Sequence, residues 1–224
     1  MTRTTNARIA GATFLLYIAA GIAGVILFGR ATSGDGIAVK LASIAQHTTE
    51  VRVAVVLSLL SCFTALVLAV TLYGITRDQD PDLAMLALTC RVAEGLLGAI
   101  FLLATLGLLW LGTTAGANAP DGVAARALGA FLLKVQSWST MIGAIFFAVG
   151  SLIFSYLLLR GRMIPAALAW LGVIASVLLV VGLPGQLSGF FTSPAFGLMW
   201  LPMLVFELTL ALWLLIKGVA KRAV

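Results

Sequence analysis

Long apolar segments alternate with short polar ones along the whole chain. Each apolar run is long enough to cross a hydrocarbon core of about 30 Å as an α-helix, which rises about 1.5 Å per residue. The pattern therefore predicts an all-α integral membrane bundle of about six transmembrane helices in a single polytopic domain, residues 1–224. The predicted spans are residues 9–29, 53–75, 83–111, 137–159, 165–188 and 198–216.

The connections between these runs predict shorter elements and turns. Apolar side chains recur at helical spacing within residues 31–52, which predicts a short interfacial helix. Asp80 or Asp82 can accept hydrogen bonds from the free amides at the start of the third span. The expected apolar face of the interfacial helix holds Ile37, Leu41, Ile44 and Ala45. The predicted chain breaks before the last span are Pro184, Gly185, Gly189 and Pro194. The predicted sites of close helix approach are Gly11, Gly21, Gly24, Gly95 and Gly98.

The composition agrees with a membrane location. Hydrophobic residues make up 62% of the chain and charged residues only 10%, whereas soluble domains carry about 25% charged residues. The net charge is +6, but the basic residues are scattered singly at the ends of apolar runs instead of forming a patch. The expected partner is therefore the lipid bilayer and not a nucleic acid, and the oligomeric state is left open.

The distribution of lysine and arginine predicts the orientation. If the N-terminus lies inside, the inner segments hold eight basic residues and the outer segments five. Cytoplasmic segments carry an excess of Lys and Arg, so the count favours both termini on the inner side. An even number of spans places both termini on the same side, so the prediction is N-in and C-in.

Three ionisable residues lie well inside apolar runs: Arg91 and Glu94 in the third span and Glu207 in the sixth. A charge at the centre of a spanning helix costs about 2.5–3.5 kcal/mol, so each should face the bundle interior and find a partner. Arg91 and Glu94 are three residues apart and share a helix face, where the guanidinium can hold the carboxylate.

Two interpretations of these charges stay open. If the third and sixth spans touch, one guanidinium faces two carboxylates, and one carboxylate is expected to hold a proton, which makes a proton or cation site conceivable. Alternatively, the charges form a buried network that fixes helix register and has no other role. A sensing or transport site requires a water-filled or ligand-sized cavity at these groups, whereas the structural alternative predicts a tightly packed, dry interior.

A second set of polar residues lies at the start of the fourth span. Lys134 and Gln136 precede its apolar run and are candidates for the mouth of a cavity. The alternative is a lysine that extends toward the interface from an ordinary helix start.

Metal, cofactor and enzyme signatures are scarce. His47 is the only histidine, and with Glu50 it falls short of the three protein ligands that a catalytic zinc needs. No metal or cofactor is expected, and the usual hydrolase and nucleotide motifs do not occur. Cys62 and Cys90 suit packing as small apolar residues. An intramembrane enzyme would need a nucleophile beside the charges, and the available ones are Thr89, Cys90 and Thr209.

Several short segments together resemble a family. They lie at residues 7–11, 91–94, 162–165, 207–208 and 213–218, in this order over nearly the whole chain. In these segments the sequence resembles the bacterial membrane proteins grouped as domain of unknown function 4386. The resemblance implies a multi-pass protein of the bacterial inner membrane and carries no activity.

The leading functional hypothesis is binding, sensing or transport of a small solute or proton at Arg91, Glu94 and Glu207. The alternatives are a structural or interaction protein and an intramembrane enzyme. The hydrophobic pattern alone does not identify a ligand, a partner or the neighbours of each span.

Overall fold

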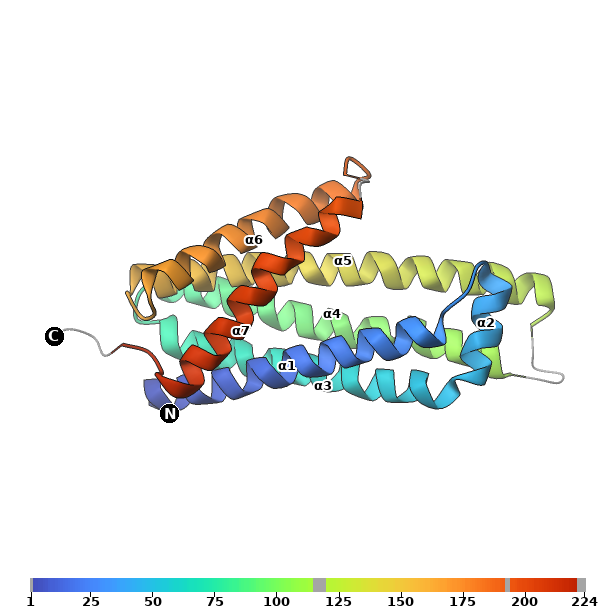
Figure 1. The fold of residues 1–224 in the computed structure, drawn as a ribbon, viewed down its shortest axis with the longest axis horizontal. Helices are drawn as coiled ribbons and strands as arrows, with labels where there is room; N and C mark the ends of the chain where they lie inside the picture. The colour runs from blue at the N-terminus through green and yellow to red at the C-terminus, as the bar shows by residue number, and fades with distance from the viewer. Residues whose placement is uncertain (1, 115–119, 192–193, 221–224) are drawn as a thin grey trace. The chain divides into compact units, whose positions relative to one another are not determined.

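The computed structural model describes residues 2–114, 120–191 and 194–220, without the side chains of 194–196 (Figure 1). Within these residues, six helices are long and apolar enough to cross a membrane. This confirms an all-α fold with the predicted number of spans. The elements are α1 (Arg3–Ala31), α2 (Ile37–Gln46), α3 (Thr48–Thr76), α4 (Pro81–Thr113), α5 (Gly122–Arg160), α6 (Ala166–Leu187), η2 (Pro194–Met199) and α7 (Trp200–Ile216).

Helix α5 begins well before the apolar run that predicted it. The run begins at residue 137, whereas the helix begins at Gly122. Asp121 caps this start, because its Oδ1 accepts hydrogen bonds from the amides of Val123 at 2.9 Å and Ala124 at 2.7 Å. With 39 residues α5 is about 58 Å long, which exceeds the length that a bilayer core requires.

The predicted short helix between the first two spans is α2. Leu41 and Ile44 are buried and belong to a cluster that includes Leu108 and Leu111 of α4. Ala45, expected on the same face, is exposed. The packed face is shifted away from Ala45, because at about 100° per residue Ile37 and Ile44 lie on one side of Leu41 and Ala45 lies on the other.

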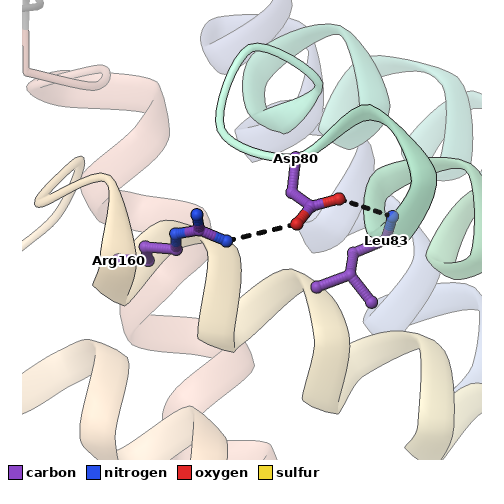
Figure 2. A network of polar contacts seen from close by, with 3 residues as sticks. All are labelled: Asp80, Leu83 and Arg160. Atoms are coloured by element: carbon purple, nitrogen blue, oxygen red, sulfur yellow. Dashed lines mark hydrogen bonds and ion pairs between the residues drawn. The ribbon is translucent and has the colours of Figure 1, made fainter.

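Asp80 caps α4 as predicted and also joins it to α5 (Figure 2). Its Oδ1 accepts a hydrogen bond from the Leu83 amide at 3.1 Å, and its Oδ2 lies 3.2 Å from Nη1 of Arg160. The Arg160 side chain is 49% exposed, so this ion pair contributes at most about 1 kcal/mol. The Asp80 carboxylate therefore caps the start of α4 and pairs with the last residue of α5.

The prediction of a break at Pro184 and Gly185 is wrong. Helix α6 continues through both residues to Leu187. Pro184 lies in the last turn and removes one intrahelical hydrogen bond, and membrane-spanning helices tolerate such prolines. The helix ends just before Gly189, whose φ of 81° is a backbone conformation that side chains disfavour.

The described chain forms two compact units. The first unit contains the described residues within 1–17, 63–95 and 141–224, and the second contains those within 18–62 and 96–140. Each unit has its own cluster of buried apolar residues, and the cluster of the first unit is the larger. In the first unit, α6 and α7 pack side by side (Figure 1).

Gly11 allows α1 and α7 to approach closely within the first unit. A β-carbon at Gly11 would lie 2.6 Å from the backbone oxygen of Ala211 and 2.6 Å from the backbone nitrogen of Leu215. Backbone atoms cannot move aside as a flexible side chain can, so no larger residue fits here. The predicted close approach at Gly11 is confirmed, and the arrangement is typical of helix contacts in lipid.

Candidate intramembrane polar site

Arg91 is the centre of the polar site in the first unit. Its side chain is 1% exposed, and its guanidinium carbon lies 4.7 Å from the ring centre of Phe147 and 5.5 Å from that of Tyr17. Gly150 of α5 leaves room for the arginine stem, since a β-carbon there would lie 3.0 Å from Cγ of Arg91. Cation–π contacts of this kind contribute about 0.5–2 kcal/mol each, depending on desolvation.

Glu94 neutralises Arg91 and binds a second residue. Nη1 of Arg91 lies 2.8 Å from Oε2 of Glu94, so the ion pair predicted from their spacing is present. The hydroxyl of Tyr17 donates a hydrogen bond to Oε1 of Glu94 at 2.7 Å. Tyr17 therefore touches both members of the pair, through its ring and through its hydroxyl.

The guanidinium of Arg91 keeps unused donors. The ion pair is short, but its N–H group is not aimed at the carboxylate oxygen, and among the described residues Nε, Nη1 and Nη2 of Arg91 have no hydrogen-bond acceptor. A guanidinium has five N–H donors, and burying them without acceptors is costly. Arg91 can therefore accommodate a further acceptor without releasing Glu94.

Glu207 of α7 lies beside the same arginine in a small cavity. Its side chain is buried, and Arg91, Glu207 and Ser155 all line this cavity, whose volume is about 10 Å³. In the described part of the chain, Oε1 of Glu207 and Oγ of Ser155 have no hydrogen-bond partner. A cavity of this size is at the lower limit for one water molecule. The structure thus brings Arg91, Glu94 and Glu207 together within the first unit.

Sequence reasoning missed three members of this site: Tyr17, Phe147 and Ser155. Each lies inside an apolar run, where aromatic residues and single serines are common and carry no distinctive pattern. The hydroxyl of Tyr17 in the first span was the one available signal, because a buried tyrosine hydroxyl usually has a hydrogen-bond partner.

Lys134 and Gln136, the predicted cavity mouth, both belong to the second unit. Lys134 lines an open pocket of about 370 Å³ together with Lys40. Gln136 is absent from that lining, and its Nε2 instead donates a hydrogen bond to Oγ1 of Thr105 at 3.2 Å. The two polar residues therefore serve different contacts, although they are neighbours in sequence.

The nucleophiles named from the sequence, Thr89, Cys90 and Thr209, do not line the cavity of Arg91 and Glu207, whereas the hydroxyl-bearing Ser155 does. Thr89 and Thr209 are exposed, and Cys90 is buried outside the cavity lining. Across residues 2–114, 120–191 and 194–220, no group of three His, Cys, Asp or Glu side chains could hold a metal ion. The cavity therefore offers acid–base groups and a hydroxyl for its chemistry.

The chain matches a known protein family. The model of the family described as "Domain of unknown function (DUF4386)" matches residues 9–218. The chain belongs to this family. No curated protein and no solved structure matches the chain. The resemblance noted in the sequence is confirmed over nearly its full length.

Proposed function

We propose that this chain is a proton-binding protein of the bacterial inner membrane, in which Glu207 takes up and releases a proton beside Arg91. The observation that supports the proposal most directly is the unpaired Oε1 of Glu207 in a cavity that Arg91 also lines. Burying a polar group without a hydrogen-bond partner costs free energy. An unpaired carboxylate oxygen inside the bundle therefore argues for a functional role.

The cavity volume favours a proton over a larger ligand. Sites for small molecules measure about 300–1,000 Å³, whereas this cavity measures about 10 Å³. A proton needs no volume of its own, and a single water molecule suffices to carry it. The hypothesis of a small-solute site at these residues is therefore set aside in favour of the proton.

The charges of the cluster explain how a proton could act on the fold. Glu94 already neutralises Arg91, so an ionised Glu207 adds one uncompensated negative charge in a medium where isolated charges are expensive. Protonation removes that charge. Release of the proton favours a rearrangement in which Arg91 turns toward Glu207, and its unused N–H donors make this possible. Proton binding would thus be coupled to the positions of α4 and α7.

The test is infrared spectroscopy of the purified protein in lipid nanodiscs. We expect a carboxylic acid C=O band at neutral pH that disappears in Glu207→Gln and loses intensity as the pH rises. Asp82→Asn is the matched control, because Asp82 is an exposed carboxylate in the first turn of α4. A spectrum without this band, or a band that Glu207→Gln leaves unchanged, would show that Glu207 does not hold the proton.

Proteoliposomes that contain a pH-sensitive dye separate two uses of the proton. A proton flux that is lost in Glu207→Gln assigns transport, whereas proton binding without flux assigns sensing. Both results are compatible with the proposal, which rests on the infrared band.

A structural protein is the second candidate, and the packing around Arg91 favours it. Two rings and one carboxylate hold the guanidinium, and the cavity has room for little besides one water molecule. This candidate predicts that Glu207→Gln changes neither proton binding nor flux and acts only on the stability of the helix packing.

A further inference from the structure

The open pocket of the second unit places two lysines from separate elements around one space. Lys40 belongs to α2 and Lys134 to α5, and the space between them measures about 370 Å³. This volume lies within the range of about 300–1,000 Å³ that is typical of ligand sites. The same lining contains the Ser137 hydroxyl and the apolar side chains of Ile37 and Leu133.

We propose that this pocket binds the phosphate headgroup of an anionic phospholipid, with Lys40 and Lys134 as its two cationic contacts. The proposal is independent of proton binding at Glu207, because it concerns residues of the second unit alone.

The charges in the pocket are not neutralised by the chain. Within the described ranges, neither Lys40 nor Lys134 forms an ion pair, and no carboxylate is part of the lining. Asp35 stands two residues before Ile37 but does not line the pocket. Two ammonium groups that line one pocket without a carboxylate are both stabilised by an anion placed in it. A phosphate has several acceptor oxygens and can bind both lysines at once.

The pocket lies where a lipid headgroup is expected. Lys134 precedes the apolar run that starts at residue 137, and its Nζ lies 6.0 Å from the ring centre of Trp138, a side chain that is 47% exposed. Tryptophan is enriched at the headgroup level of both membrane faces, so a cationic pocket beside Trp138 is placed to meet lipid phosphates. The apolar side chains of Ile37 and Leu133 suit the glycerol and upper acyl carbons of a lipid.

The start of α2 also favours an anion in this pocket. Gly36 is the N-cap of this 10-residue helix, lines the pocket, and provides no side-chain hydrogen bond to the first amides. Free amides and the helix dipole favour an anion at such an end. This contribution adds to that of the two lysines and does not replace it.

The experiment measures lipid binding to the full chain in a neutral detergent by native mass spectrometry. Phosphatidylglycerol is compared with phosphatidylcholine of the same acyl chains, for the wild type, Lys40→Gln, Lys134→Gln and the double variant. Each lysine near an anionic surface contributes enough for about a fivefold change, so we expect single variants to lose about fivefold in phosphatidylglycerol binding and the double variant about 25-fold. Arg126→Gln is the control, because Arg126 is an exposed basic residue of α5 outside the pocket.

Two outcomes would overturn the proposal. Equal binding of both lipids would show that the pocket does not select an anion, and an equal loss in Arg126→Gln would show that only net charge matters. Added inorganic phosphate distinguishes the source of the phosphate. Weak or no competition supports the lipid headgroup, whereas phosphate that binds tightly and depends on both lysines, without selective lipid binding, assigns the pocket to free phosphate.

Discussion

Arg91 in the first unit and Lys134 in the second are both cations of an apolar chain, but their surroundings are opposite. Arg91 is 1% exposed, and the chain itself supplies a carboxylate and two aromatic rings around it. Lys134 is exposed and has one tryptophan ring beside it. A buried cation has to be compensated within the protein, whereas a cation at a pocket rim leaves this task to water, lipid or a ligand.

The replacement Arg91→Ala tests this comparison with the largest expected effect. It leaves Glu94 and Glu207 as buried carboxylates without a cation, and breaking a buried pair in this way costs about 3–5 kcal/mol. The free energy of unfolding in mixed micelles measures the loss. Lys134→Ala is the matched comparison and should change stability little. Equal effects of the two variants would remove the distinction between the sites.

The replacement Tyr17→Phe tests the hydrogen bond between Tyr17 and Glu94 in the first unit. It keeps the ring over Arg91 and removes only the hydroxyl that donates to Glu94 at 2.7 Å. Hydrogen bonds to charged groups contribute about 1.5–3 kcal/mol, and a destabilisation in this range is expected in the same unfolding assay. A variant as stable as the wild type would mean that Glu94 is satisfied by Arg91 alone.

Gly11→Ala compares the helix contacts of the two units. A methyl group at Gly11 collides with the backbone of α7, so we expect a destabilisation of about 1–3 kcal/mol. Gly29 is the control in the second unit, because it lies on the same helix and a β-carbon there has nothing within 4 Å. Gly29→Ala should be neutral or stabilise the helix by up to about 1 kcal/mol. Thermal unfolding of both variants in detergent checks the pair, and equal melting temperatures would contradict the close approach.

Arg160→Ala has the smallest expected effect. Its ion pair with Asp80 lies at the surface of the first unit (Figure 2) and contributes about 0–1 kcal/mol. The loss should shrink further as salt is added to the unfolding assay, since exposed charges are screened. A loss as large as that of Arg91→Ala would show that burial does not separate the two ion pairs.

Local features of the chain were predictable from the residues alone. The spans follow from the length of the apolar runs, the α4 cap from an aspartate before a proline start, and the Arg91–Glu94 pair from a spacing of three on one helix. Each depends on residues that are close in sequence. The inward orientation of both termini stays a prediction, because it rests on the count of basic residues in the connections.

The sequence by itself thus determined the class of protein, the number of spans and the family to which the chain belongs. Only the tertiary structure decided that Glu207 lies beside Arg91, that Tyr17 holds Glu94, and that Lys40 and Lys134 face one pocket. The physical reason is that hydrophobicity specifies that a helix enters lipid but not which of its faces meets another helix. That choice depends on small residues and polar contacts between segments far apart in the chain, and many arrangements of apolar helices satisfy the same hydrophobic pattern.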